Sequence, residues 1–300
     1  MKILKKMMIG FTTAALMIGA CLGTVFAEEE SESETQLQET TGTYNLLLIG
    51  VDRRDDTWYG NSDVMLLVTV NSEKEKIYMT SFMRDLYADI PGIGVRKLNA
   101  ACANGGAELC VQTIEENYQV QIDNYAMVDF NSMADIVEAI GGVELEISEE
   151  EMEHINKRLP EQYKVAGKGD PVYLDHAGEV WLDGYQAVAY TRDRYTGSTS
   201  DFGRTERQRK LLTAIFEKVK SDYVETQSTS TLQSLLSYTS HDLTGGDTLK
   251  LMMKASDWMN YELEEVRVPF DDMYYSENEI LIPTDMAATR EKLQDILYRQ

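Results

Sequence analysis

The stretch "YNLLLIGVD", residues 44–52, decides the fold expected for this chain. Its apolar residues are consecutive, and they run directly into Gly50 and Asp52. A continuous apolar run is typical of a strand buried at the centre of a sheet, and polar residues at its end are typical of a functional loop. We therefore expect a sheet built around this strand, with chemistry at its carboxyl end.

Further strands and helices alternate along the rest of the chain. Two strands are predicted at "VMLLVTVN" and "IYMTSFM" (64–71 and 77–83), joined by the charged turn "SEKEK". The remaining predicted strands lie at 124–130, 143–147 and 264–270. Helices are predicted at 107–118, 132–140 (capped by Asn131), 205–220, 232–238, 247–260 and 287–298. The pattern predicts an α/β fold in a single domain, with a central mixed sheet flanked by helices on both faces.

Two stretches are harder to interpret. The sequence "DGYQAVAYTRDR", residues 183–194, predicts a helix that leads into a strand. Residues 148–175 are polar with few periodic cues, so they are expected to be irregular.

The first residues are typical of a targeting segment. Three lysines precede an apolar run at 7–27, and "VFA" places small residues before Glu28. The segment 1–27 is a cleaved signal peptide, a retained membrane anchor or, through Cys21, a lipoprotein leader. In each case the rest of the chain lies on the extracytoplasmic side. Residues 28–43 are acidic and rich in Ser and Thr, which predicts a flexible linker.

Charge excludes one class of partner. The formal net charge is -23, and the first 27 residues contain three basic and no acidic side chains, so the remainder carries -26. Such a surface repels nucleic acid. The cysteines Cys102 and Cys110 match no zinc pattern. A disulfide between them is permitted if Gly105-Gly106 breaks the helix, but two buried thiols are the favoured interpretation.

Arginines are concentrated at 189–210 of this acidic chain. If the segment before the loop is extended, Arg192 and Arg194 share a face, and on the following helix Arg204, Arg207 and Gln208 do so. Several guanidinium groups around one concavity suit a pyrophosphate, whose oxygens they bind in pairs. Salt bridges to nearby acidic residues are the alternative.

Carboxylates lie at the ends of the first predicted strands. Asp52 ends one strand and Asp63 begins the next, so both can meet at one point and hold Mg²⁺ together with phosphate oxygens. Turn capping and pairing with arginines are the alternative roles. Arg84 and Asp85 end a third strand, at the edge where open α/β sheets bind ligands.

These residues carry a resemblance to a known family. The stretches "LLLIGVDRR", "NSDVMLLVTVN", "SFMRDLYADIPG", "KLNAACANGGAEL", "LDGYQAVAYTRDR" and "DFGRTERQ" follow the order of the LytR-CpsA-Psr family of cell-wall ligases. The resemblance covers about 44–220. It implies a catalytic domain at 44–222, and we expect residues 223–300 to form an extension of helices and a strand that packs on the same domain.

The resemblance also implies a function. Family members are phosphotransferases that move a glycopolymer from undecaprenyl pyrophosphate to a hydroxyl of peptidoglycan at the membrane surface. It implies that Asp52 and Asp63 hold Mg²⁺, for which Mn²⁺ is an alternative. The basic and polar positions expected to contact the pyrophosphate are Arg54, Arg84, Lys97, Arg192, Arg194, Arg204, Arg207 and Gln208. Asp85 is the first candidate for a general base and Asp201 the second, with Arg84 beside them.

Departures and alternatives remain. Asn61 replaces an arginine that is frequent in the family, and Met83 replaces a proline. The family has a lipid channel between sheet and helices, although plain core packing is favoured for most of its candidate residues here: Met127, Val128, Phe130, Met133, Ile136, Val137 and Ile140. A binding module without turnover, a membrane-tethered regulator and a pyrophosphatase are the competing functions.

Overall fold

The computed structural model describes residues 42–53, 58–193, 196, 201–226 and 230–299. Within them, a six-stranded sheet has the order β10-β3-β2-β1-β6-β9. β1 pairs parallel with β6 and antiparallel with β2, and β3 pairs antiparallel with β2 and parallel with β10, so the sheet is mixed. Its strands are β1 (Thr43–Asp52), β2 (Asn61–Asn71), β3 (Lys76–Phe82), β6 (Asn124–Asp129), β9 (Ser240–His241) and β10 (Glu262–Val268).

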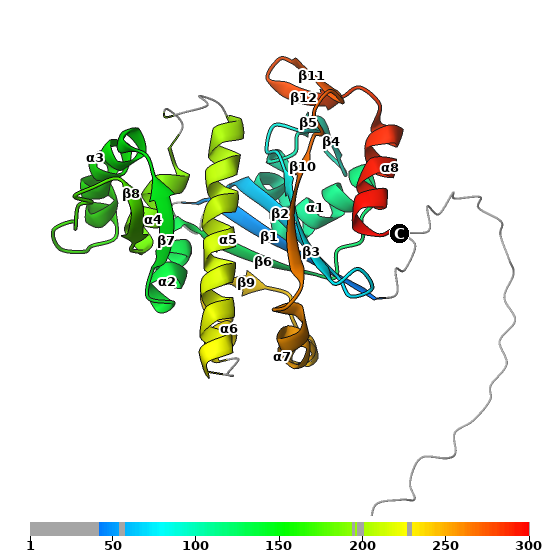
Figure 1. Ribbon diagram of the computed structural model, residues 1–300. Helices are drawn as coiled ribbons and strands as arrows, with labels where there is room; N and C mark the ends of the chain where they lie inside the picture. The colour runs from blue at the N-terminus through cyan, green and yellow to red at the C-terminus, as the bar shows by residue number, and fades with distance from the viewer. Residues whose placement is uncertain (1–41, 54–57, 194–195, 197–200, 227–229, 300) are drawn as a thin grey trace, which may run out of the picture. The chain divides into compact units, whose positions relative to one another are not determined.

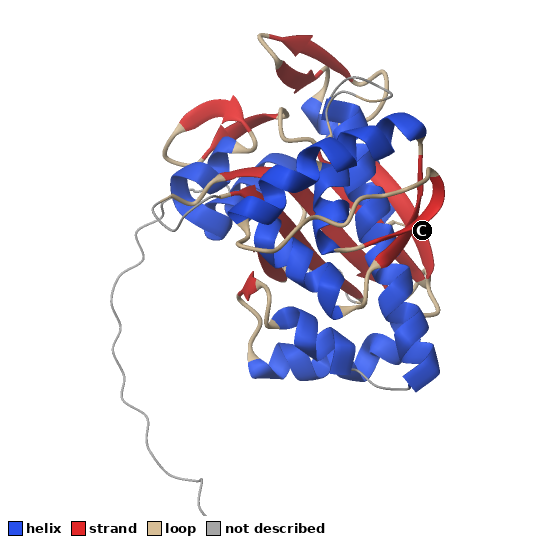
Figure 2. Cartoon of the chain, turned by 90° about the vertical axis from the view of Figure 1, so that its left-hand side faces the viewer, coloured by secondary structure: helices blue, strands red, loops and turns tan. Residues whose placement is uncertain are grey.

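Helices cover both faces of this sheet, and α5 crosses the front of it in Figure 1. The turned view in Figure 2 shows helices on either side of the strands. The α/β prediction is therefore confirmed. The helices are α1 (Ala100–Tyr118), α2 (Phe130–Ala139), α3 (Glu149–Val165), α4 (Gly184–Thr191), α5 (Asp201–Thr226), α6 (Ser230–Leu236), α7 (Gly245–Trp258) and α8 (Met286–Leu297). In the described part of the chain, no helix is both long enough and apolar enough to cross a membrane.

The central strand β1 separates two apolar regions. Its alternate residues Leu47, Ile49 and Val51 are buried in one core together with α1 and α8. The intervening residues Leu48 and Gly50 face the opposite side, toward α2 and α5. This alternation follows from the pleat of a strand, which directs successive side chains to opposite faces. The second face is where the site described below is found.

Three two-stranded ribbons extend from the central layers. The ribbon β4–β5 follows β3 directly, and β7–β8 packs with α3, α4 and α5 around a second core. The bounds of the ribbon strands are β4 (Tyr87–Ile90), β5 (Gly94–Lys97), β7 (Val143–Ile147), β8 (Gly178–Leu182), β11 (Tyr274–Glu277) and β12 (Ile280–Pro283). The C-terminal part of the chain supplies β9 and β10 to the central sheet.

The expectation of an irregular segment at 148–175 is wrong for most of its length. Residues Glu149–Val165 form α3, which begins with a capping box between Ser148 and Glu151. The apolar Ile155 and Leu159 lie one turn apart on its inner face and are fully buried. A helix that buries so narrow a stripe carries few apolar residues, which is why its composition suggested a loop.

Two smaller predictions are also wrong. Arg192 and Asp193, the residues described directly after α4, do not form a strand: Arg192 caps the helix in right-handed helical backbone geometry. The α4 residues Ala187, Val188 and Ala189 are buried, so their packing stabilises the helix. The helix α2 is capped by Asp129 instead of Asn131, because the Asp129 carboxylate accepts a hydrogen bond from the Ser132 backbone N–H.

Cys102 and Cys110 are free, buried thiols on α1, which is interrupted at Gly105 and Gly106. Burial raises the pKa of Cys102 to about 11 and raises the pKa of Cys110 as well. Because the thiolate is the reactive form, we expect neither thiol to react with iodoacetamide at pH 8 in the folded protein. A Cys21→Ser variant isolates these two groups, and mass spectrometry measures their labelling. Rapid labelling without unfolding would contradict the burial.

Candidate functional site

A β-bulge places Asp63 at the edge of the site. Val51 pairs with Ser62 and Gly50 with Val64, so Asp63 is the extra residue between them. Bulges re-aim side chains, and here both Asp63 and Val64 turn toward the α5 side of the sheet. Gly50 allows this, because a Cβ atom there would lie 2.9 Å from the Val64 side chain. The bulge is the local feature that sequence periodicity did not show.

A continuous network of ion pairs joins Asp63 to four other residues that were predicted for the site. Arg84 Nη1 lies 3.0 Å from Asp63 Oδ1, and Arg204 Nη1 lies 3.4 Å from Asp63 Oδ2. Arg84 Nε is 3.3 Å from Asp85 Oδ2, and Lys97 Nζ is 2.9 Å from Asp85 Oδ1. Residues from β2, the β3–β4 turn, β5 and α5 are thus brought to one place.

Pairing with carboxylates, against the effect of burial, keeps the cations of this network charged. The side chain of Arg204 is only 3% exposed. Burial alone would lower the pKa of Lys97, but its hydrogen bonds to Asp85 and Glu279 and their charges outweigh that effect and raise the pKa above its usual value. Glu279 itself is 90% exposed, so solvent screens its contribution.

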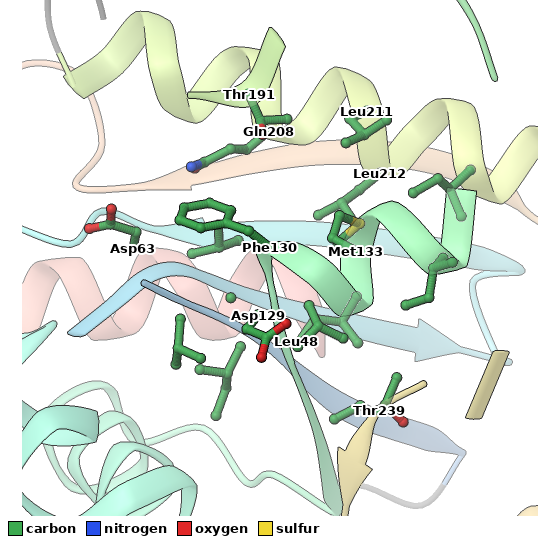
Figure 3. Close-up of a pocket in the computed structure, with 18 of the residues that line it drawn as sticks. Leu48, Asp63, Asp129, Phe130, Met133, Thr191, Gln208, Leu211, Leu212 and Thr239 are labelled. Carbon is green, nitrogen blue, oxygen red and sulfur yellow. The ribbon is translucent and has the colours of Figure 1, made fainter. Parts of the chain in front are cut away.

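An apolar cavity of about 220 Å³ opens beside this network. Asp63 and Gln208 lie at one end, and Thr239 lies at the other (Figure 3). Arg204 and Gln208 are four residues apart on α5, so the same helix face that carries the guanidinium group also lines the cavity. Most of the remaining lining side chains are aliphatic or aromatic: Leu48, Val64, Ala126, Val128, Phe130, Met133, Ile136, Leu211, Leu212, Ile215 and Leu235.

The predicted lipid-channel residues divide into two groups. Val128, Phe130, Met133 and Ile136 line the cavity, so interpreting them as plain core was wrong. The other three have the core role: Met127, Val137 and Ile140. The difference follows from geometry, because alternate residues of β6 and different faces of α2 point to different layers.

Arg192 also lies at this cavity, although it is the C-terminal cap of α4 and not part of an extended segment as predicted. Its guanidinium carbon is 4.6 Å from the centre of the Phe130 ring, which lines the cavity. Two residues that sequence reasoning missed lie nearby: Arg53 Nη2 is 3.7 Å from Asp129 Oδ2, and Asp129 is part of the cavity wall. The tandem arginines of "VDRR" were the signal that could have identified Arg53.

Arg207 contacts residues outside the network around Asp63. Its Nε donates to Glu151 Oε1 at 2.8 Å, and its Nη groups donate to the Asp193 carbonyl at 3.3 Å and to Thr196 Oγ1 at 2.9 Å. The residue therefore ties α5 to α3 and to the segment after α4. A pyrophosphate contact by Arg207, as the resemblance implies, stays a prediction.

We expect Arg207→Ala to lower the free energy of unfolding by about 3 kcal/mol, because it leaves Glu151 without its cation. Burial raises the pKa of Glu151, but the Ser148 backbone N–H and Arg207 outweigh it, so the pKa lies below its usual value. The stabilisation is therefore present above the unfolded pKa and is lost as the pH falls through the folded one. Denaturant unfolding at pH 7 and pH 3 measures it. An equal difference between variant and parent at both pH values would contradict the pairing.

Asp52 and Asp63 suit a divalent cation only together with a substrate. Asp52 faces Asn61 in the β1/β2 register, and Asn61 is two residues from Asp63, so their side chains leave the same face. Carboxylate oxygens combined with phosphate oxygens and water are typical of Mg²⁺ sites. Among the residues described here, no group of three or more His, Cys, Asp or Glu side chains could hold a metal ion.

The remaining predicted residues cannot be placed in the site. Arg54 and Arg194 lie outside the described residues. Asp201 begins α5, but its side chain also lies outside what the structure describes.

The cavity and its charged end can be compared with known proteins. The chain is 33% identical over 219 residues to the polyisoprenyl-teichoic acid–peptidoglycan teichoic acid transferase TagU of Enterococcus faecalis, covering 72% of this chain and 65% of that protein. It is 32% identical to TagT of Bacillus subtilis, covering 72% of this chain and 62% of that protein. The match thus spans somewhat less than two thirds of either relative.

Solved structures share the fold. The structure of TagT bound to LI-WTA has a TM-score of 0.64 and 28% identity, covering 86% of this chain and 91% of that one. The structure of YwtF (TagT) with bound octaprenyl pyrophosphate lipid has a TM-score of 0.62 and 26% identity, with the same coverage. The LytR_cpsA_psr family model matches residues 21–295, nearly the whole length, and the chain therefore belongs to the LytR-CpsA-Psr family.

Proposed function

We propose that this chain is a phosphotransferase that moves a glycopolymer from undecaprenyl pyrophosphate to a hydroxyl of peptidoglycan, with formation of a phosphodiester. One observation carries the proposal. An apolar cavity of about 220 Å³ has Asp63 and Gln208 at one end, where Arg84 and Arg204 converge on Asp63. A ligand that fits both parts is an amphiphile with an anionic head and a hydrocarbon tail.

Each part of the site suits one part of such a donor. The aliphatic wall buries prenyl units, each CH₂ group contributing about 0.8 kcal/mol. Arg84 and Arg204 are held in fixed positions by Asp63, so they can bind phosphate oxygens without first being ordered. The names of the relatives, TagU and TagT, support the same class of donor and acceptor.

The reaction that follows is a phosphoryl transfer by positioning. The acceptor hydroxyl attacks the sugar-proximal phosphorus, the phosphorus–oxygen bond to the lipid phosphate breaks, and undecaprenyl phosphate leaves. Arg84, Arg204 and Lys97 stabilise negative charge on the phosphate oxygens. Mg²⁺ bound by Asp52 and Asp63 would neutralise further charge on these oxygens.

The contacts of Asp85 favour a positioning role over that of a base. One oxygen accepts a hydrogen bond from Lys97, the other lies 3.3 Å from Arg84 Nε in an ion pair, and the side chain is 11% exposed. A carboxylate held between two cations orients them toward the ligand. The acceptor proton would then leave to water, to Asp85 after displacement of Lys97, or to Asp201. A role of Asp201 stays a prediction.

The proposed location is the outer face of the cell membrane. It rests on the lysines and apolar run of residues 1–27, which lie outside the described residues. Retained, this segment would hold the site beside the lipid-linked donor. Cleaved, it would release the protein for capture of the donor at the membrane surface.

A transfer assay tests the proposal. The full chain in detergent micelles is incubated with a synthetic prenyl-pyrophosphate-linked glycan, peptidoglycan oligomers and Mg²⁺, and products are identified by mass spectrometry. Glycan joined to peptidoglycan through a phosphodiester is the expected result. Free glycan capped by phosphate would indicate a pyrophosphatase, and unchanged donor that remains bound would indicate a binding module. Omission of Mg²⁺ measures the contribution of the ion.

A further inference from the structure

Two adjacent aromatic side chains lie exposed at the rim of the site. Trp58 is 48% exposed and Tyr59 is 55% exposed, in the connection between β1 and β2. Single exposed apolar residues are ordinary, but two consecutive exposed aromatic residues present an unusual amount of apolar surface. Neither ring belongs to the cavity or to the ionic network described above.

The position of Tyr59 is fixed by an unusual feature of α1. Gly106 has φ 74° and ψ -162°, a conformation that is essentially confined to glycine, and it interrupts the helix. A Cβ atom at Gly106 would lie 3.4 Å from Tyr59 Cε1, so the ring packs against this bare backbone. One edge of the Tyr59 ring thus packs against the kink, and the rest of the ring is exposed to solvent.

Hydrogen-bonding groups lie beside the ring. The same Cβ position at Gly106 would be 3.2 Å from Glu108 Oε2, so Glu108 and Tyr59 are neighbours. Glu108 is exposed, and its other oxygen accepts from the Tyr125 hydroxyl at 2.9 Å. Burial and this hydrogen bond raise the pKa of Tyr125 to about 12, so the phenol stays a donor. Glu108 Oε2 is therefore oriented to accept from a ligand.

The ring is also close enough to the phosphate end of the site. Gly60, directly after Tyr59, approaches the Asp52 backbone: a Cβ atom on Gly60 would lie 3.0 Å from the Asp52 carbonyl oxygen. Four residues separate Tyr59 from Asp63, which is at most about 14 Å of extended chain. A short glycan attached to a phosphate bound by Arg84 and Arg204, beside Asp63, can span this distance.

We propose that Tyr59, with Trp58 beside it and Glu108 at its edge, forms a saccharide subsite in which a pyranose ring stacks on the aromatic face. The apolar C–H face of a sugar suits an aromatic ring with a polar rim, and a sugar hydroxyl donates to Glu108. This inference rests on the proposed function, because such a transferase handles two glycans. The subsite takes the sugar of the donor or a sugar of the acceptor.

Binding of lipid-free probes tests the subsite without turnover. N-acetylglucosamine 1-phosphate represents the donor, and the N-acetylglucosamine–N-acetylmuramic acid disaccharide represents the acceptor. Affinities for the full chain in micelles are measured by ligand-detected NMR. We expect Tyr59→Ala to weaken binding of one probe about tenfold, since it removes one aromatic contact. The probe affected identifies which glycan uses the subsite.

Two further variants make the result specific. Tyr59→Phe keeps the ring and is expected to bind within about twofold of the parent. Tyr173→Ala removes an aromatic side chain of similar exposure, 54%, from the distant loop before β8 and is expected to have no effect. Unchanged binding of both probes by Tyr59→Ala, or an equal loss with Tyr59→Phe, would overturn the proposal. Because no turnover is measured, failure of the transfer assay leaves this test intact.

Discussion

Arg204→Ala is expected to lower kcat about 10²- to 10³-fold while the protein stays folded. The side chain is 3% exposed and its Nη1 is 3.4 Å from Asp63 Oδ2, so in the proposed reaction it would be a donor already fixed beside the phosphate. Asp63 keeps its second partner, Arg84, at 3.0 Å, so the substitution does not leave an unpaired buried carboxylate. Activity of the purified variant is measured in the transfer assay.

A basic residue of the same helix provides the control. Lys210 is half exposed and pairs with Glu206 one turn earlier on α5, and Lys210→Ala is expected to keep its activity. Arg204→Lys should not restore turnover, because an ammonium group lacks the planar fork that binds two oxygens. Full activity of Arg204→Ala would exclude a role at the phosphate. Loss of the circular-dichroism signal of the folded state would show that Arg204 is structural.

The sequence was sufficient to predict five of the six strands of the central sheet, all except the two-residue β9. Strands such as "YNLLLIGVD" combine consecutive apolar residues with polar ends, and the core that contains α1 and α8 depends on this pattern. The helix α3 was missed because its buried side is a single stripe around Ile155 and Leu159, while the rest of its surface is charged. Composition averages over the helix, so a narrow stripe is lost unless its capping box is recognised.

The site was predictable in its residue types but not in its geometry. Asp63, Arg84 and Arg204 are separated by up to 141 residues along the chain, yet they meet through one bulge and one helix face. Local spacing contains no information about the register shift at Gly50. The same limit explains Arg207, which shares a face with Arg204 on an ideal helix but is drawn to Glu151 by tertiary packing.

Apolar periodicity likewise could not separate a cavity from a core. Phe130 and Met133 occupy helical positions that would suit ordinary packing, and only the space left between α2, α5 and the sheet shows that they line a cavity. Whether a void persists depends on the volumes of all facing residues, including Gly50 and Ala126, which come from other elements.

Met133→Trp is expected to weaken binding of a long-chain polyprenyl phosphate about 10²- to 10³-fold, because the indole occupies part of the cavity. Met133 lies between Phe130 and the leucines of α5 (Figure 3), where a lipid chain would pass. Burial of one five-carbon prenyl unit contributes about 4 kcal/mol. Excluding a single unit from the cavity therefore removes about three decades of affinity. Fluorescence of a labelled polyprenyl phosphate, titrated in micelles, measures the change.

The control variant for this prediction is Met133→Leu, which keeps the volume and is expected to bind as the parent does. Binding of inorganic pyrophosphate tests the charged end of the site independently of the apolar cavity. Its affinity should be the same in Met133→Trp and in the parent, because the network around Asp63 is untouched. The thermal midpoint of Met133→Trp should not fall, since the larger side chain enters existing space. Lipid affinity equal to that of the parent would mean that the hydrocarbon chain lies outside this cavity.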